Sequence, residues 1–474
     1  MKICGRGLNF FQVIDYLGTV RLCGWMSNCS IGKLTEQSIE EIYHGKKANN
    51  IRLSLANKDY SNCVIDACPY LSKNIVEDKR IEINEVPKYP QELYLAYENV
   101  CNYQCTSCNL PLIMNNNKSI DLEECYERIE REIKKALPYV KTLSANGVGE
   151  LFVSKRILKL LADWRPITPS SEISVLLETN GSLFDEHHWS KIENLGQYNL
   201  TVFITIMSFD EKIYQILSGV NYPISKIEEN LRFVKSLKEK GIINRLEIAT
   251  VVQERNFRTM PEFTRRSIEE FGADSVRLRP YAPWEAKPFE HEWFADVRNK
   301  YHPYHEEYLE IMKDPIFKHP KADDWGGGKS SQIGDYPYKQ YIQLHQIEKK
   351  RADILLTIIE NDDFISWFGD EIGISELIIY GLGHIGRVIT KLIHDKVKFS
   401  YIIDRGIDIN EYMGKKILSL SEIDDTEKDE LILITLLNDV DKVKEELKEK
   451  KYIGKVIDIE EIINKYNCMS PNYK

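Results

Sequence analysis

Three cysteines with a short, fixed spacing are the residues of this chain best suited to chemistry. Cys101, Cys105 and Cys108 form a C-x3-C-x2-C triplet after the alternating stretch 92–97, which is typical of a strand. A structural zinc site closes its tetrahedron with four protein ligands, whereas a cubane iron–sulfur cluster held by three thiolates leaves one iron open. With 10 cysteines in 474 residues, a prescribed triplet arises by chance at roughly 10⁻⁵ per start position. The triplet therefore predicts an iron–sulfur site that can bind a further molecule.

The segments around the triplet alternate between strand-like and helix-like patterns. Strands are predicted at 93–97, 140–144, 173–178, 201–206, 246–252 and 275–278, and amphipathic helices at 121–137, 154–164, 185–194, 225–240 and 259–271. This alternation indicates an α/β fold with a parallel sheet and crossover helices. In such folds the loops at the carboxyl ends of the strands form the site.

The composition and the strand–helix pattern of the sequence divide the chain into four expected domains. Residues 1–85 are rich in cysteine, and residues 86–283 carry the alternating pattern. Residues 284–372 form an irregular, aromatic, partly helical connector, and residues 373–474 return to strand–helix alternation.

Composition and charge exclude several classes of protein. The apolar runs are shorter than the roughly 18 residues of a membrane span, and the N-terminus lacks the apolar stretch of a signal peptide. The net charge of −10 comes without a polybasic run, which argues against a nucleic acid partner. We therefore expect a cytoplasmic protein, without a membrane partner, whose cysteines are reduced and available to bind metal.

Short motifs after the next strands complete a pattern shared with one enzyme family. A glycine-rich segment at 145–150 ends in Gly-Glu, the segment 177–181 contains Thr-Asn-Gly, and the segment 206–210 contains Ser-Phe-Asp. Together with the cysteine triplet, these motifs resemble the signature of radical S-adenosylmethionine (SAM) enzymes. In that family the open iron of a 4Fe-4S cluster is chelated by the amino and carboxylate groups of SAM.

The resemblance implies a partial (β/α)6 radical SAM barrel and assigns roles to individual residues. Cys101, Cys105 and Cys108 would each bind one iron. The residues implied in SAM binding are Gly147, Gly149, Glu150, Asn180, Ser208 and Asp210. In that family the glycine-rich motif contacts the methionine amino group, for which a carboxylate is a natural acceptor. Asn180-Gly181 is equally typical of an ordinary tight turn. In related enzymes the Ser-Phe-Asp segment binds either the ribose hydroxyls or the substrate.

The N-terminal region resembles a SPASM module, which is a small auxiliary iron–sulfur domain. The matching pieces are 18–23, 31–34 and the C-x4-C pair of Cys63 and Cys68. The ligands that the resemblance implies for a second 4Fe-4S cluster are Cys4, Cys23, Cys63 and Cys68, with Cys29 as a possible replacement for Cys4. Zinc bound by the same four thiolates is the alternative. The module usually follows the barrel, whereas here it precedes it.

The C-terminal region carries a G-x-G-x2-G turn formed by Gly381, Gly383 and Gly386, placed between a strand-like stretch and a helix start. Asp404 follows the next strand-like stretch, at a position suited to a ribose hydroxyl. This context predicts a Rossmann-like domain. Because about 100 residues make only half of a dinucleotide fold, the domain is either a site for NAD or a sugar nucleotide or a structural appendage.

These observations lead to one preferred function and two alternatives. The preferred function is a radical SAM enzyme of oxidoreductase or epimerase type. It takes an electron from a flavodoxin or ferredoxin, cleaves SAM, and abstracts hydrogen from a small metabolite such as a sugar or sugar nucleotide. The alternatives are a ribosomal-peptide maturase of the radical SAM/SPASM type and a non-catalytic iron–sulfur or nucleotide sensor. Production of 5′-deoxyadenosine separates the enzymes from the sensor.

Overall fold

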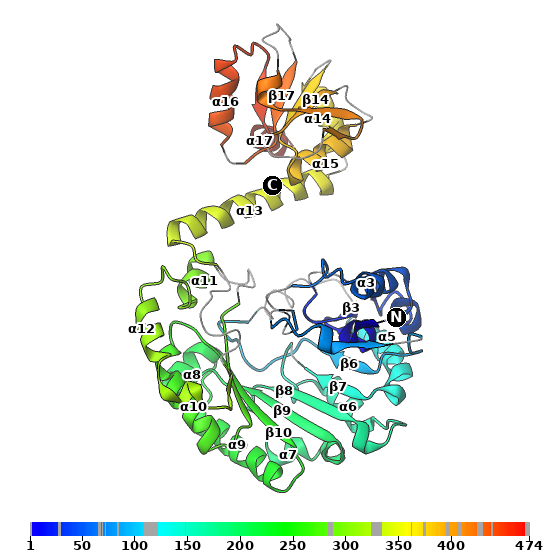
Figure 1. Ribbon diagram of the computed structural model, residues 1–474, viewed down its shortest axis with the longest axis vertical. Helices are drawn as coiled ribbons and strands as arrows, with labels where there is room; N and C mark the ends of the chain where they lie inside the picture. The colour runs from blue at the N-terminus through cyan, green and yellow to red at the C-terminus, as the bar shows by residue number, and fades with distance from the viewer. Residues whose placement is uncertain are drawn as a thin grey trace. The chain divides into compact units, whose positions relative to one another are not determined.

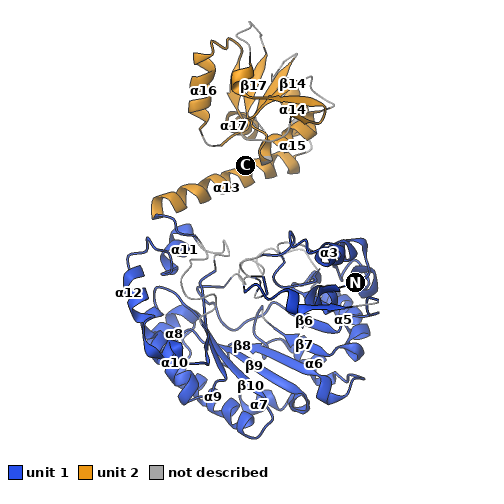
Figure 2. Cartoon of the chain, in the orientation of Figure 1, with its two compact units in different colours: residues 1–337 blue, residues 338–474 orange. Residues whose placement is uncertain are grey.

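The computed structural model describes residues 2–469 apart from 27–29, 65–67, 69, 72, 83–84, 109–121, 147, 283–287, 324–333, 362, 373–375, 395–398, 406–409, 424–429 and 438. The chain divides into two compact units, residues 1–337 and 338–474 (Figure 2). The boundary between them falls inside the expected connector 284–372, whose two halves belong to different units. Each unit is described by itself.

A ten-stranded sheet forms the centre of the first unit, with the strand order β12-β11-β10-β9-β8-β7-β6-β2-β3-β4. The strands are β2 (Phe10–Val13), β3 (Thr19–Arg21), β4 (Gly32–Lys33), β6 (Glu92–Leu95), β7 (Thr142–Ala145), β8 (Ser174–Thr179), β9 (Asn199–Thr205), β10 (Arg245–Val251), β11 (Ser275–Arg279) and β12 (Ala322–Asp323). The strands from β12 to β2 in this order are parallel to their neighbours, whereas β3 pairs in antiparallel fashion with both β2 and β4. The strands β6 to β11 coincide with the six predicted segments, so the predicted parallel α/β core is confirmed.

Amphipathic helices lie along the outer face of this sheet (Figure 1). They are α5 (Leu122–Ala136), α6 (Lys155–Asp163), α7 (Glu186–Trp189), α8 (Glu211–Ser218), α9 (Ile224–Glu239) and α10 (Met260–Glu269). In α5 the fully buried residues Ile129, Ile133 and Ala136 recur at helical spacing and form one apolar stripe. In β8 the alternate residues Val175 and Leu177 are buried, which leaves the intervening side chains on the inner face.

Shorter elements complete the unit. The remaining helices are α1 (Gly5–Asn9), α2 (Ile39–Tyr43), α3 (Lys46–Ala56), α11 (Phe289–Ala295) and α12 (His305–Ile311). The 3-10 turns are η1 (Glu77–Lys79), η2 (Leu137–Tyr139), η3 (Ser170–Glu172), η4 (Glu193–Gln197), η5 (Phe257–Thr259) and η6 (Pro315–Lys318).

The N-terminal segment is continuous with the main sheet. Strand β2 lies parallel to β6, with Phe10 opposite Glu92 and Val13 opposite Leu95. A separate two-stranded antiparallel sheet joins β1 (Lys2–Cys4) to β5 (Arg80–Glu82). The cysteine-rich region therefore extends the barrel sheet by three strands.

The second unit is an α/β layer structure built on a six-stranded sheet of order β15-β16-β14-β13-β17-β18. Its strands are β13 (Leu377–Tyr380), β14 (Phe399–Ile403), β15 (Glu411–Tyr412), β16 (Lys415–Leu418), β17 (Leu431–Ile434) and β18 (Val456–Asp458). Its helices are α13 (Tyr338–Glu360), α14 (Phe364–Ile372), α15 (His384–Ile393), α16 (Val440–Glu449) and α17 (Ile459–Met469), with the 3-10 turn η7 (Leu420–Glu422). All strand pairs are parallel except β15 with β16. The first strand, β13, lies between β14 and β17, so the chain changes direction across the sheet at this strand.

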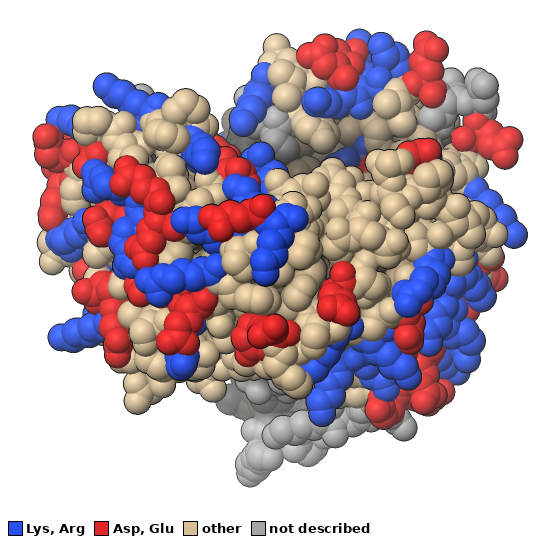
Figure 3. Space-filling model, turned by 90° about the horizontal axis from the view of Figure 1, so that it is seen from below, with Lys and Arg blue, Asp and Glu red and all other residues tan. Residues whose placement is uncertain are grey.

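Charges of both signs alternate over the face shown in Figure 3, around an uncharged area. Helices α9 and α10 give an example of this mixture, since Arg266 pairs with Glu228 at 2.8 Å and Arg232 pairs with Glu270 at 2.8 Å. Among the helices that the structure describes, none has both the length and the apolar character needed to cross a membrane.

Candidate functional site

The cysteine triplet lies on the loop that follows β6, at the edge of the sheet where the parallel strands end. Backbone hydrogen bonds fix this loop to the end of α8, from Gln104 N to Ser218 O at 3.0 Å and from Thr106 N to Leu217 O at 2.9 Å. Within the loop, Tyr103 N donates to Cys101 Sγ at 3.4 Å. Burial raises the pKa of Cys101 to about 11. The loop is therefore held in place by α8, a helix that the pattern of the sequence does not predict.

Glu150 joins the loops that follow β7 and β8. Its buried carboxylate accepts hydrogen bonds from Thr179 Oγ1 at 2.6 Å, from Asn180 N at 2.7 Å and from Phe152 N at 3.2 Å. Its backbone N–H donates to Val100 O at 2.7 Å, just before the cysteine triplet. Burial raises the pKa of the Glu150 carboxyl, and these hydrogen bonds oppose the rise. Glu150 thus braces three loops, and its direct contact with SAM stays a prediction.

The glycine-rich segment after β7 approaches the cysteine loop closely. Gly149 has φ of +117°, and a Cβ at this position would lie 2.6 Å from Val100 O, so only glycine fits. Beside it the buried Asn146 has an amide whose N and O both lack a hydrogen-bond partner within the described residues. Such orphaned polar atoms are costly, and they fit a site that a polar ligand completes. Gly147 lies outside the described residues.

Asn180 points toward the cysteine loop from the end of β8. Its Nδ2 donates to Asn102 Oδ1 at 2.9 Å, and Asn102 Nδ2 in turn donates to Ser182 Oγ at 2.9 Å. The structure therefore brings Cys101, Glu150 and Asn180 to one place. Asn102 was missed from the sequence because it carries no motif signal of its own.

Ser208 and Asp210, after β9, are engaged in local structure. Asp210 is exposed, and its carboxylate caps α8 by accepting from Ile213 N at 2.9 Å. The buried Ser208 hydroxyl accepts from Asp210 N at 3.1 Å and lies 3.3 Å from Thr259 Oγ1. Their role in binding ribose or substrate stays a prediction. Capping of α8 is a structural reason for an aspartate at position 210.

Charged and polar side chains line the inner face of the sheet below this edge. Tyr94 on β6 donates to Glu178 on β8 at 3.1 Å, and Arg277 on β11 pairs with Glu247 on β10 at 2.6 Å. Burial raises the pKa of Glu178, and the charge of Arg279 opposes the rise. Buried charges are costly unless they are paired, and these pairs allow the inner face of the sheet to remain polar.

Four N-terminal thiols lie near the opposite edge of the sheet, where the parallel strands begin. Cys4 ends β1 before the chain enters β2, and Cys23 follows β3, which runs back toward the same edge. Cys63 lies in a β-bridge with Met26, and Cys68 N donates to Val64 O at 2.9 Å. The site that these residues form is here called the N-terminal thiol group. Cys29 lies outside the described residues.

The N-terminal thiol group has the chemistry of a ligand set. Burial, and then the neighbouring thiols of Cys23, Cys68 and Cys4, raise the pKa of Cys63 to about 12. Ligation by a metal removes this penalty, because it stabilises the thiolate form. Within the described part of the chain, no three His, Cys, Asp or Glu side chains converge closely enough to hold a single metal ion. In a cubane each thiolate binds a separate iron.

Single replacements test this ligand set. Cys23→Ala, Cys63→Ala and Cys68→Ala should each lower the iron content of anaerobically reconstituted protein, because a cluster with one thiolate missing is bound more weakly. Cys29→Ala is the matched control and should leave iron unchanged. Zinc in place of iron in protein purified without air would contradict the cluster assignment.

The glycine turn of the second unit lies at the end of β13. Leu382 N donates to Asp404 Oδ2 at 2.6 Å, and Thr435 Oγ1 donates to Gly381 O at 2.6 Å. A Cβ on Gly386 would lie 1.9 Å from Gly381 O, so this glycine is required for packing of the turn on α15. Gly383 is exposed, and a Cβ there would meet no atom within 4 Å. The structure thus brings the predicted glycines and Asp404 together.

Gly383→Val tests whether a nucleotide binds at this turn. Gly383 has φ of −69° at the N-cap of α15, so valine should cost at most about 1 kcal/mol of stability. If a pyrophosphate sits against this backbone, the variant should lose the heat of binding measured with NAD or a sugar nucleotide. Equal heats for the variant and the parent would contradict binding at this turn, and absence of heat in the parent would favour the structural appendage.

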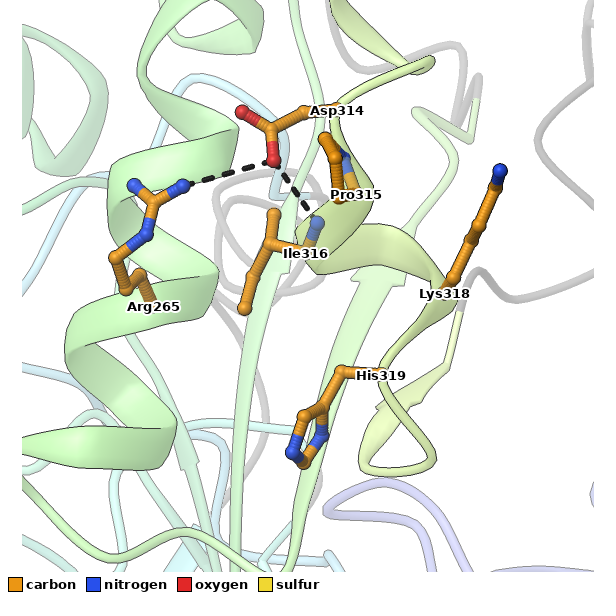
Figure 4. A pocket seen from close by; sticks show the side chains of 6 residues that line it. All are labelled: Arg265, Asp314, Pro315, Ile316, Lys318 and His319. Atoms are coloured by element: carbon orange, nitrogen blue, oxygen red, sulfur yellow. Dashed lines mark hydrogen bonds and ion pairs between the residues drawn. The ribbon is translucent and has the colours of Figure 1, made fainter.

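A separate surface pocket of about 520 Å³ lies where η6 meets α10 (Figure 4). Arg265 and Asp314 pair across it at 3.5 Å, and Asp314 Oδ1 also accepts from Ile316 N at 2.9 Å. His319 Nδ1 accepts from Lys321 N at 3.1 Å. These groups are engaged in local turns, and the pocket lies on the helical layer rather than at the loops of the cysteine triplet.

The geometry places the cysteine triplet beside Glu150 and Asn180 at the carboxyl edge of a parallel α/β sheet. A sequence model of the Radical SAM superfamily matches residues 98–266, and a model of SPASM, an iron–sulfur cluster-binding domain, matches residues 4–69. The chain therefore carries a radical SAM domain together with a SPASM-like module. No curated protein matches the chain.

Solved structures give weaker similarities. Streptococcus suis SuiB bound to S-adenosylmethionine is 16% identical with a TM-score of 0.36, over 63% of this chain and 58% of SuiB. SuiB bound to the precursor peptide SuiA is 17% identical with a TM-score of 0.34, over 61% and 55%. The radical S-adenosylmethionine methyltransferase TsrM from Kitasatospora setae, with cobalamin and a [4Fe-4S] cluster bound, is 14% identical with a TM-score of 0.26, over 38% and 35%. The chain thus spans less than two thirds of these proteins.

Proposed function

We propose that the chain is a radical SAM enzyme that cleaves SAM reductively and uses the resulting radical to abstract hydrogen from its substrate. The observation that carries this proposal is the junction of three loops by Glu150, which holds the cysteine triplet beside the glycine-rich segment and Asn180. A 4Fe-4S cluster would be held by Cys101, Cys105 and Cys108, and it supplies the electron for cleavage of SAM.

The surrounding residues position the cofactor. Gly149 allows the backbone after β7 to lie close to the cysteine loop, and the amide of Asn146 offers both a donor and an acceptor. Asn180 is fixed by Asn102, so its side chain is pre-oriented. The polar inner face below these loops, with Tyr94 and Glu178, receives the substrate and keeps competing groups away from the radical.

We further propose a ribosomal peptide as the substrate class. Peptide substrates are common among radical SAM proteins with a SPASM module, and a model of that module matches this chain at residues 4–69. SuiB, one of the weak structural matches, has been solved with its precursor peptide SuiA. The peptide alternative now stands ahead of the small metabolite preferred from the sequence.

A small metabolite remains the second candidate because of the C-terminal unit. Its glycine turn and Asp404 meet at the end of β13, where the strand order changes direction. Ligands of open α/β sheets bind at such points. NAD or a sugar nucleotide at this turn would support the metabolite, and the calorimetry of Gly383→Val decides that point.

The test of the proposed function is anaerobic turnover of reconstituted protein with SAM and dithionite. Formation of 5′-deoxyadenosine and methionine is expected, and its absence would favour the non-catalytic sensor. Addition of short peptides encoded beside the gene should raise 5′-deoxyadenosine formation and change the mass of one peptide. A mass change in a sugar nucleotide instead would support the metabolite.

A further inference from the structure

Arg6 occupies a fixed position beside the N-terminal thiol group. It lies in α1, two residues after Cys4, and its guanidinium carbon is 4.7 Å from the centroid of the Phe10 ring and 4.4 Å from that of Trp25. Trp25 follows Cys23 by two residues, and its carbonyl accepts from Val64 N at 2.9 Å. Stacking between two rings holds the guanidinium where the chain segments that carry the thiols meet.

The guanidinium has no anionic partner of its own in the described part of the chain. Arg6 is only partly exposed, and none of the ion pairs between described residues includes it. Its charge acts on the start of the barrel sheet, since it opposes the rise in the pKa that burial causes at Glu92 on β6. A positive charge thus lies against Trp25, in the segment that carries Cys23, and near Glu92 at the start of β6.

A cluster bound by four thiolates is an anion, and one-electron reduction adds a further negative charge. The reduction potential of such a cluster depends on nearby charge and on solvent exposure. A fixed positive charge stabilises the reduced state more than the oxidised state. Partial burial strengthens the effect, because the surroundings screen the charge less than water does.

We propose that Arg6 raises the reduction potential of the iron–sulfur cluster bound by Cys4, Cys23, Cys63 and Cys68, and so makes this cluster the better electron acceptor. The inference rests on the ligand set of the proposed function. In the corresponding step one electron passes to the cluster from dithionite, the reductant of the titration below, whose SO₂ radical anion is oxidised by one electron to SO₂. Arg6 acts on the cluster through its charge alone and does not bind iron.

The experiment is a redox titration, followed by electron paramagnetic resonance, of the full-length protein with Cys101, Cys105 and Cys108 replaced by alanine. Only the N-terminal cluster remains in this background, so its signal is unmixed. Arg6→Gln should shift the midpoint to a more negative potential with iron content unchanged. Arg6→Lys, which keeps the charge, should remain close to the parent.

Arg258→Gln is the matched control, because Arg258 also stacks over two rings, 4.3 Å from that of Phe257 and 4.6 Å from that of Tyr304, and lies on η5. It should leave the midpoint unchanged. An unchanged midpoint in Arg6→Gln, or an equal shift in Arg6→Lys, would overturn the inference. Loss of iron in Arg6→Gln, alone or together with Arg6→Lys, would show a role in holding the cluster and overturn the inference as well. Absence of iron from the background itself would refute the ligand set, and the inference with it.

Discussion

Joint replacement of Cys101, Cys105 and Cys108 by alanine will halve the iron of reconstituted protein, from about eight to about four atoms per chain, and will abolish formation of 5′-deoxyadenosine. The loop that carries these residues is fixed to α8 by backbone hydrogen bonds that the substitutions leave in place. The fold should therefore survive the loss of the cluster. Iron analysis and chromatographic detection of 5′-deoxyadenosine are the measurements.

The control for this experiment is Cys125→Ala. Cys125 lies on α5 and is partly exposed, but it belongs to neither proposed ligand set. Its replacement should leave both iron and activity unchanged. Retained cleavage of SAM in the triple variant would refute the assignment of the triplet as the site of the reaction.

The second large effect is expected at Gly219, which ends α8 in the left-handed region with φ of +70°. A Cβ there would lie 2.4 Å from the carbonyl oxygen of Gln104 in the cysteine loop. Gly219→Ala should therefore cost on the order of 3–5 kcal/mol of unfolding free energy, because backbone strain and a clash add together. The loop must move, so the variant should also lose the iron of the barrel cluster.

Gly241→Ala separates the two contributions. Gly241 has φ of +74°, but a Cβ on it would meet no atom within 4 Å. Its replacement should cost only the backbone strain, about 1–2 kcal/mol, and should leave iron unchanged. Chemical denaturation and iron analysis of both variants are the measurements. Equal losses of unfolding free energy in the two variants would mean that the clash with the cysteine loop does not contribute to the loss of stability.

The parallel core was predictable because its signals are local. Each of β6 to β11 has an apolar stretch of its own. Because an amphipathic helix lies between most of these stretches, a helical crossover between parallel strands is the simplest connection. Helix α8 was missed although Asp210 and Gly219 mark its two ends. The Ser-Phe-Asp motif was assigned to ligand binding, whereas the same aspartate also satisfies the ordinary rules of capping.

The joining of the N-terminal region to the barrel could not be predicted. The pairing of Phe10 with Glu92 depends on contacts between distant parts of the chain, and no periodicity in either segment specifies the partner. The same holds for the partners of Glu150. The sequence placed this residue in a motif, but three donors around its carboxylate come from the folded loops, and only the structure shows that it braces them.

The pairing of β2 with β6 also constrains the order in which the protein folds during synthesis. During synthesis the strand Phe10–Val13 leaves the ribosome well before its partner Glu92–Leu95, and until then its backbone groups on that side have no strand to pair with. An unpaired edge of this kind invites aggregation. The N-terminal segment therefore cannot take its place in the sheet until the chain has been made as far as β6.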